Sequence, residues 1–209
     1  MYNAKIDLKY ACCILRMQVS TASVRYGHAD AYCGCRAKAY WIYAEGKMER
    51  RDKINYYLDL ADVVSRRGTC LRKRYGAVIV KNDEVISTGY VGAPRGRKNC
   101  SDLGFCIRQK MNIPRGERYE LCRSVHAEAN AIISASRDKM IDSTIYLSGR
   151  EMDTGDYVKN ANCCSMCKRM IINAGIARVV VRDTDSEYRV IDVKSWIDDD
   201  DSLSGSFGY

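Results

Sequence analysis

Two short motifs near the middle of the chain constrain its fold more than any other feature. The first is His126-Ala-Glu128 and the second is Cys164-Ser-Met-Cys167, with 35 residues between Glu128 and Cys164. One imidazole and two thiolates suit zinc, and a catalytic zinc keeps its fourth position for water. Because one ion would need all three ligands, the fold has to bring the two motifs into contact.

Glu128 stands two residues after His126, so its carboxylate can face the same zinc-bound water. Zinc lowers the pKa of bound water to roughly 7, and a carboxylate beside that water can carry its proton. The alternative is a structural zinc site on the cysteine pair, with the His-Ala-Glu triplet arising by chance. No other histidine follows residue 28, which excludes a competing site with several imidazoles in that part of the chain. We therefore expect metal ligands at His126, Cys164 and Cys167 and a proton shuttle at Glu128.

Each motif is followed by the pattern of a helix and then a strand. Residues 126–137 and 164–174 are rich in small and apolar residues, as in packed helices, and residues 143–147 and 177–181 are rich in β-formers. The ligands are therefore expected at the starts of two helices in a β/α alternation.

The residues that precede the first motif predict the remaining helix and strands of the fold. Residues 49–67 have the spacing of an amphipathic helix, and residues 75–81 and 84–90 predict two strands around an Asn82-Asp83 turn. A long connection follows, over residues 91–123. This order predicts an α/β fold, a three-layer α/β/α sandwich with a mixed central sheet.

Charge and composition narrow the class of partner. The net charge is +8, but residues 1–47 hold seven Lys or Arg against three Asp or Glu, which leaves a surplus of four elsewhere. That surplus suits a small phosphate-bearing substrate and argues against nucleic acid, which is usually met by a denser basic stripe with aromatic residues. The sequence has no signal peptide and no apolar run of about 18 residues. We expect a cytoplasmic protein without a membrane span, whose eleven cysteines are reduced thiols and metal ligands.

Five segments, in order, carry a family resemblance. They are Thr69-Cys70-Leu-Arg72, Tyr75-Gly-Ala-Val-Ile-Val80, Gly89-Tyr-Val-Gly-Ala-Pro94, His126-Ala-Glu-Ala-Asn-Ala-Ile132 and Ile171-Ile-Asn-Ala-Gly-Ile-Ala-Arg-Val179. From residue 48 to about residue 181 the chain resembles the deoxycytidylate deaminase family of the cytidine deaminase superfamily. The resemblance implies a cytidine deaminase-like fold and the zinc-dependent hydrolysis of dCMP to dUMP and ammonia, which feeds thymidylate synthesis.

The resemblance also assigns roles to single residues. His126, Cys164 and Cys167 match the family's zinc ligands, and Glu128 matches its proton shuttle. Arg137 stands where a family arginine faces the nucleotide phosphate, which suits a guanidinium fork. The other interpretation of Arg137 is a solvated cation at a helix end.

Further implications concern the pocket and its regulation. Gly92, Ala93 and Pro94 match a segment that lines the family's substrate pocket, although a bend at the end of a strand would also explain them. The resemblance implies a homo-oligomer, often a hexamer, that responds to dCTP and dTTP. A Mg²⁺ ion would accompany a dCTP effector.

Some relatives hold a second, structural zinc beside the active site. By this resemblance its ligands would be Cys70 and three cysteines of the long connection, Cys100, Cys106 and Cys122. Four thiolates form a closed tetrahedral site, which would fasten a loop that is long for its lack of structure. The alternative is buried free thiols, since cysteine packs as a small hydrophobe.

The chain departs from the family pattern at three positions. Cys163 replaces a proline before the first ligand cysteine, Val91 replaces an asparagine, and Asp185 replaces a phosphate-facing tyrosine of some members. These changes affect the substrate more than the zinc chemistry. Two alternatives therefore stay open: a deaminase of another nucleotide or of a base in RNA, and a catalytically silent zinc module that binds nucleotides or partners.

The domain boundaries follow from these segments. We expect a zinc-dependent deaminase domain over residues 48–197 and an acidic, flexible tail over residues 198–209. Residues 1–47 form a leader with four cysteines and little periodicity. It has three interpretations: a tail, a metal-binding appendage, or sequence upstream of the native start.

Overall fold

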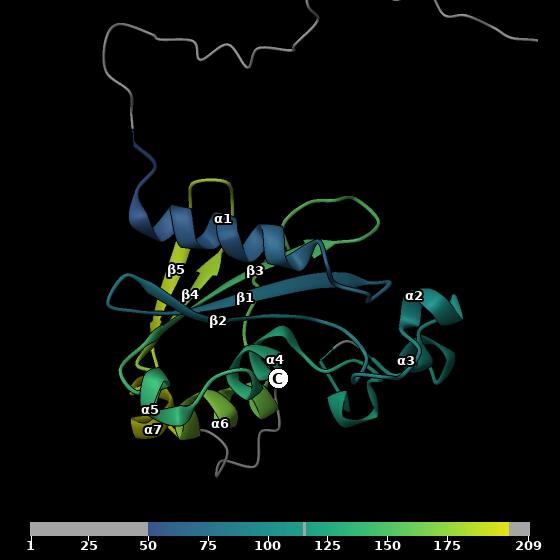
Figure 1. The fold of residues 1–209 in the computed structure, drawn as a ribbon. Coiled ribbons are helices and arrows are strands. Elements are labelled where there is room, and N and C mark those ends of the chain that lie inside the picture. Colours follow the sequence, from purple (N-terminus) through teal and green to yellow (C-terminus); the bar gives the residue numbers. More distant parts are fainter. Residues whose placement is uncertain (1–49, 115, 201–209) are drawn as a thin grey trace, which may run out of the picture. The chain divides into compact units, whose positions relative to one another are not determined.

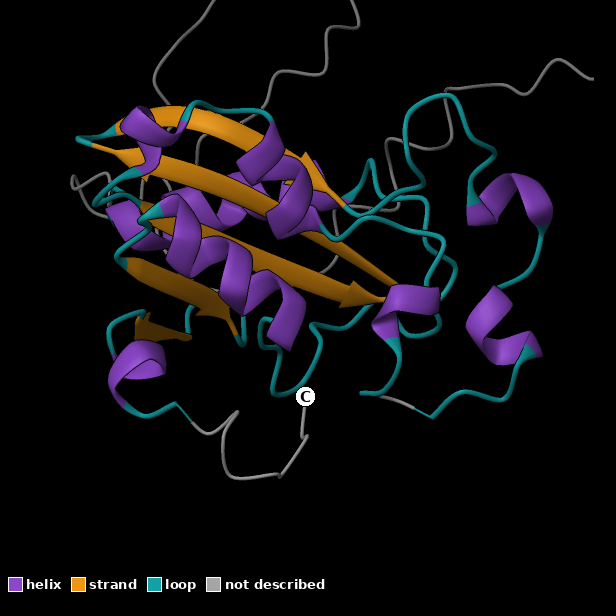
Figure 2. Ribbon diagram, turned by 90° about the horizontal axis from the view of Figure 1, so that it is seen from below, coloured by secondary structure: helices purple, strands orange, loops and turns teal. Residues whose placement is uncertain are grey.

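The computed structural model describes residues 50–114 and 116–200 (Figure 1). The expected leader over residues 1–47 lies outside the described residues, as do residues 201–209 of the expected tail. The described part contains a mixed five-stranded sheet with helices on both faces (Figures 1 and 2). The predicted α/β/α sandwich is confirmed.

The sheet has the strand order β2-β1-β3-β4-β5. Only β3 and β4 run parallel, and the other neighbours are antiparallel. The strands are β1 (Lys73–Lys81), β2 (Glu84–Tyr90), β3 (Thr144–Glu151), β4 (Arg178–Arg182) and β5 (Tyr188–Asp192). The longer helices are α1 (Lys53–Ser65), α4 (Ala127–Ile133) and α6 (Ser165–Ala174). The shorter ones are α2 (Cys100–Leu103), α3 (Ile107–Lys110), the 3₁₀ turn η2 (Tyr119–Leu121), α5 (Arg137–Met140) and α7 (Ser195–Asp198).

The β1–β2 hairpin forms where the sequence predicts it. Asn82 and Asp83 have φ values of 51° and 64°. A two-residue turn needs positive φ at both positions to match the twist of its strands, and Asn and Asp tolerate that conformation better than most residues. The hairpin therefore follows from local sequence.

Helix α1 covers one face of the sheet, as predicted, although it is shorter than the expected range 49–67 (Figure 1). Asp52 caps its first turn, with the carboxylate accepting a 3.0 Å hydrogen bond from the Asn55 N–H. Tyr57, Leu58 and Ala61 pack against the sheet residues Val78, Val80, Tyr146 and Val180 to form the smaller core cluster.

Helices α4, α5, α6 and α7 cover the other face (Figures 1 and 2). Apolar residues of α4 and α6 form the larger core cluster with the alternate side chains of β1, β3 and β4. Helix α6 is the crossover that joins the parallel strands β3 and β4, so the second ligand motif lies on this face by topology.

Three elements differ from the sequence-based expectations. The helix expected over residues 126–137 ends at Ile133, and α5 begins after Ser136, whose extended backbone (ψ 147°) separates the two. Serine favours such helix ends because its hydroxyl competes for backbone hydrogen bonds. Strand β5 was not predicted, since Arg189 and Asp192 obscure its alternation at a half-exposed sheet edge. Asp198, expected in the tail, ends α7.

None of the described helices has the length and apolar character needed to cross a membrane.

Gly89 of β2 allows α4 to lie directly on the sheet. A Cβ added at Gly89 would stand 2.2 Å from the Ala127 carbonyl oxygen and 2.3 Å from the Ala131 nitrogen. We predict that Gly89→Ala lowers the free energy of unfolding by about 1–3 kcal/mol because it pushes α4 off the sheet. Chemical denaturation measures this, with the exposed neighbour Thr88→Ala as control, expected within about 0.5 kcal/mol of the parent. A Gly89→Ala protein as stable as the control would contradict this packing.

Candidate active site

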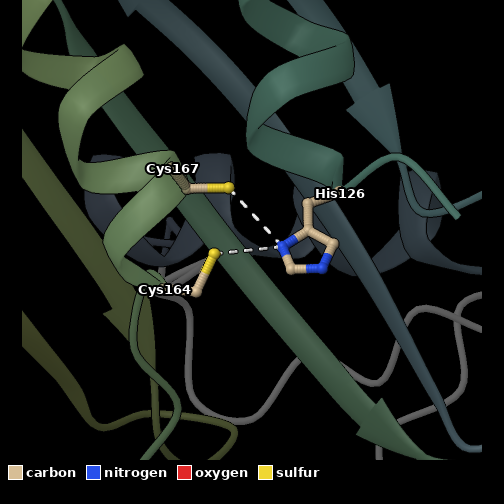
Figure 3. Close-up of side chains that lie close together, drawn as sticks. All are labelled: His126, Cys164 and Cys167. Atoms are coloured by element: carbon tan, nitrogen blue, oxygen red, sulfur yellow. Dashed lines mark hydrogen bonds between the residues drawn. The ribbon is translucent and has the colours of Figure 1, made fainter. Parts of the chain in front are cut away.

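His126, Cys164 and Cys167 lie together on the face of the sheet covered by α4 and α6 (Figure 3). The His126 Nδ1 atom is 3.4 Å from the Cys164 Sγ and 3.5 Å from the Cys167 Sγ. Tetrahedral zinc with ordinary bond lengths places its nitrogen and sulfur ligands roughly 3.5 Å apart. Among the described residues this is the one group of three or more potential ligands close enough for a single ion. The donor set and its spacing therefore fit zinc.

The ends of two helices position these ligands. His126 is the residue before α4 and Cys164 is the residue before α6, while Cys167 lies in the first turn of α6. Helices α4 and α6 contact each other on the same face of the sheet. Two motifs that are distant in sequence thus meet because each precedes a helix packed on that face.

The site opens into a cavity of about 440 Å³. His126, Glu128 and Cys164 form one part of its wall. The wall also includes three cations, Arg72, Lys73 and Arg108, and two residues with side-chain amides, Asn160 and Asn162. The cavity thus combines a metal-ligating end with a positively charged lining.

Glu128 has the burial expected of a proton shuttle. Its side chain belongs to α4, is 5% exposed and lines the same cavity as His126. Burial raises the pKa of the Glu128 carboxyl, and the nearby His126 opposes this only in part. The nearby Cys163 thiol also acts to lower this pKa. Glu128 can therefore hold a proton more readily than an exposed glutamate.

The three ligand side chains shift one another's pKa values. Cys167 and then His126 lower the pKa of Cys164. Burial lowers the pKa of His126, but its contact with Cys164 and the charge of Glu128 outweigh this, so the net shift is upward. A metal ion would displace the remaining protons, because zinc binds cysteine as the thiolate and histidine as the neutral imidazole.

Arg137 and the segment after β2 do not reach the cavity. The Arg137 Nε donates a 2.9 Å hydrogen bond to the Asn173 carbonyl oxygen, at the start of α5. Gly92, Ala93 and Pro94 are also absent from the cavity wall, whereas the preceding residue Val91 contributes to it. The reason is a β-bridge between Gly92 and Val125 and a hydrogen bond from the Ala93 N–H to Asn99, which turn the segment into the long connection.

The four cysteines expected at a second zinc lie in one region without forming a ligand group. Cys70, Cys106 and Cys122 line the cavity, and Cys100 is buried, with its sulfur 3.8 Å from the Ser124 hydroxyl oxygen. Burial first, and then the neighbouring thiols, raise the pKa of Cys100 and Cys122. The residues that the structure describes place no common metal position among these four. A second zinc therefore stays a prediction.

Two residues of the long connection were missed in the sequence and support the metal site. Arg108 is 4% exposed, and its guanidinium lies 4.4 Å from the centre of the Tyr119 ring. Tyr119 in turn meets the His126 ring edge-on, with centroids 5.2 Å apart. No spacing rule connects positions 108, 119 and 126, because their contact depends on the path of an irregular loop.

Asp185, expected near the substrate phosphate, lies elsewhere. Its carboxylate accepts a 2.9 Å hydrogen bond from the Tyr157 hydroxyl, and its carbonyl oxygen accepts hydrogen bonds from Arg51 and Arg182. It does not line the cavity. Within one chain, the carboxylate therefore does not oppose an anion in the cavity.

Comparison with known proteins places this site in a family. The family model for the cytidine and deoxycytidylate deaminase zinc-binding region matches residues 51–183, well over half of the chain. This chain is a member of that family. The match agrees with the resemblance seen over residues 48 to 181. Because this family region binds zinc and the His-Cys-Cys group has zinc's donor chemistry, zinc is the metal of this deaminase-family chain.

Several individual proteins are similar to this chain. The deoxycytidylate deaminase of Mycobacterium phage D29 is 36% identical over 138 residues, which are 64% of this chain and 96% of that protein. The deoxycytidylate deaminase of Schizosaccharomyces pombe is 30% identical over 144 residues, 64% of this chain but 41% of that protein. The crystal structure of dCMP deaminase from the cyanophage S-TIM5 aligns with a TM-score of 0.43 at 23% identity, covering 64% of this chain and 84% of that one. This family member thus spans nearly all of the phage D29 protein and less than half of the yeast one.

Replacement of single cysteines tests the ligand set. We predict that Cys164→Ala loses one equivalent of zinc per chain, because the ion loses a thiolate ligand. The adjacent Cys163→Ala is the matched control and is expected to keep the zinc of the parent protein. Metal analysis of each purified protein measures the zinc content. Equal zinc loss in both variants would contradict the assignment of Cys164 over Cys163.

Proposed function

We propose that this chain is a zinc-dependent deaminase that hydrolyses dCMP to dUMP and ammonia. The observation that carries the proposal is that two members of the His-Cys-Cys group, His126 and Cys164, line one cavity of about 440 Å³ together with the buried Glu128. The family match, and relatives named deoxycytidylate deaminase, support it. A silent zinc module has no use for Glu128, since a purely structural site has no open coordination position for a carboxylate to serve.

Zinc held by His126, Cys164 and Cys167 would supply an acidified water as the nucleophile. Glu128 then performs the proton transfers that the reaction needs. Its carboxylate takes one proton from the attacking water and delivers it to the pyrimidine ring nitrogen, then takes the second proton of the same oxygen and gives it to the amino group, which leaves as ammonia as the carbon–nitrogen bond breaks. Burial suits this cycle, because it raises the pKa of Glu128 and so makes the protonated carboxyl easier to form than in an exposed glutamate.

The cations in the cavity support a phosphorylated substrate over a nucleoside. Lys73 is already paired with Glu151 at 2.7 Å, and one amino group of Arg108 donates to the carbonyl oxygens of Pro114 and Glu117. Arg72 lines the cavity, and its guanidinium neither donates a hydrogen bond to a described residue nor forms an ion pair with one. A guanidinium offers a fixed fork of donors that fits phosphate oxygens. We assign the 5′-phosphate to Arg72, in place of Arg137.

The remaining features of the resemblance form part of the same proposal. A homo-oligomer, with the family's hexamer as one form, is supported by large apolar side chains exposed on β2 and α4: Val85, Tyr90 and Ile133. Regulation by dCTP and dTTP, a Mg²⁺ ion with dCTP, and a cytoplasmic location stay predictions from the sequence.

Glu128→Gln separates zinc binding from catalysis. We predict that this variant keeps the parent's zinc content but loses at least about 10²-fold in kcat, because glutamine cannot carry a proton. Ammonia release and the loss of cytosine absorbance measure turnover, and metal analysis measures zinc. A zinc-loaded Glu128→Gln protein that turns over dCMP at the parent rate would refute the mechanism.

Arg72→Met tests the nature of the substrate. We predict that kcat/KM for dCMP falls about 10- to 100-fold, from the loss of a charged hydrogen-bonded contact, while the value for deoxycytidine hardly changes. Arg178→Met, at the exposed start of β4, is the charge-matched control and is expected to behave as the parent. Equal losses for dCMP and deoxycytidine would contradict phosphate binding by Arg72. Turnover of a cytosine in RNA in preference to dCMP would favour the alternative substrate class.

A further inference from the structure

A second hollow, of about 370 Å³, lies on the face of the sheet that carries α1. Three arginines line it: Arg66 at the end of α1, Arg74 on β1 and Arg150 on β3. Successive side chains of a strand point to opposite faces, so Arg74 faces this hollow while its neighbours Lys73 and Tyr75 line the catalytic cavity. The two cavities are therefore on opposite sides of β1.

Two of these arginines oppose each other directly. Arg74 and Arg150 are register partners in the antiparallel pairing of β1 and β3. Partners of this kind hold their Cβ atoms about 4.5–5.5 Å apart, and like charges in such a pair destabilise a sheet unless a counter-charge is near. The two positive charges of this pair therefore need a negatively charged group nearby.

The acids in the hollow are already engaged by other cations. Asp62 accepts a 2.7 Å hydrogen bond from the Arg150 Nε and lies 3.6 Å from the Arg66 guanidinium. Glu151, the other acid in the wall, pairs with Lys73 at 2.7 Å. One carboxylate thus serves two arginines, and none among the described residues pairs with Arg74.

The hydrogen bonding of Arg74 is also incomplete. Its Nε is buried, and no described residue accepts a hydrogen bond from it. The carbonyl oxygens of Val63, Val64 and Ser65, at the end of α1, accept backbone N–H groups, and none of them is a partner of the Arg74 Nε. An unpartnered guanidinium donor in a protein wall is costly unless a ligand completes it.

Arg150, in contrast, is held in place. Its guanidinium stacks on the Tyr157 ring at 3.6 Å and donates a 3.2 Å hydrogen bond to the Gly155 carbonyl oxygen. The hollow therefore combines a fixed arginine, an arginine without a counter-ion and the largely exposed Arg66. An excess of positive charge with preoriented donors is the arrangement that binds phosphate oxygens.

We propose that this hollow is an anion site, distinct from the catalytic cavity, that binds a phosphate group between Arg74, Arg150 and Arg66. The phosphate bridges the register-paired arginines and supplies the counter-charge that the acids of the wall do not. The group is a free phosphate ion or the phosphate of a small monoester.

Titration calorimetry on the full, zinc-loaded chain tests the site at constant ionic strength, with inorganic phosphate and glycerol 3-phosphate as separate ligands. We expect saturable binding of at least one of them, and Arg74→Met weakens it at least about tenfold because a charged hydrogen-bonding group is lost. Arg67→Met, one residue from Arg66 but outside the hollow, is the matched control and keeps the parent affinity. The titrations are repeated in the Arg72→Met background, which removes the phosphate contact proposed for the catalytic cavity, and binding to the second hollow is expected to remain there and to weaken on Arg74→Met.

Thermal unfolding in phosphate-free chloride buffer separates ligand binding from a structural role. There Arg74→Met is expected to unfold at the same temperature as the parent or higher, because it relieves the repulsion with Arg150. Phosphate then raises the Tm of the parent and of Arg67→Met, and raises that of Arg74→Met less. The proposal is overturned if neither ligand binds, if Arg74→Met binds as tightly as the parent, or if only Arg72→Met loses the binding.

Discussion

The contact between α4 and α6 is the interaction on which the rest of this structure depends. Each helix is preceded by a ligand residue, so packing the two side by side on one face of the sheet brings His126 and Cys164 together. Helix α4 reaches that position because Gly89 has no side chain to hold it away. Helix α6 reaches it because the crossover between the parallel strands β3 and β4 has to cover the sheet. The metal site is thus a product of the core.

The sequence predicted the parts of the molecule that obey local rules. The Asn82-Asp83 turn, the buried face of α1 and the helix after each ligand motif all follow from residue type and spacing. Strand β5 was not predicted, because an exposed edge strand has no apolar alternation to detect. Arg182 is a further case. It is buried and joins β4 to α1 through Asn55 and Asp59, contacts between residues more than 120 positions apart that no local pattern encodes.

The candidate site also has one part that the sequence predicts and one part that it does not. Its metal-ligating end is encoded in two motifs, and the structure brings His126, Cys164 and Cys167 together, with Glu128 in the same cavity wall as His126. The substrate end is built by the strand β1 and by the long connection, whose path depends on tertiary contacts. Arg137 was expected there, but its side chain donates a hydrogen bond to the Asn173 carbonyl oxygen. Arg72 lines the cavity, and in the sequence it was only one residue of a family motif with no role assigned to it. Motif spacing therefore predicts the metal-ligating residues better than it predicts the residues that contact the substrate.

Cys163 shows that the start of α6 does not depend on a proline. The family resemblance implies a proline at this position, and this chain has a buried thiol there instead. A proline would give the helix start its rigidity. Here the Cys163 N–H donates to the Asn162 side chain at 2.9 Å, and the Cys164 carbonyl oxygen accepts the Lys168 N–H. These backbone contacts leave Cys164 and Cys167 in position to bind a metal without that constraint.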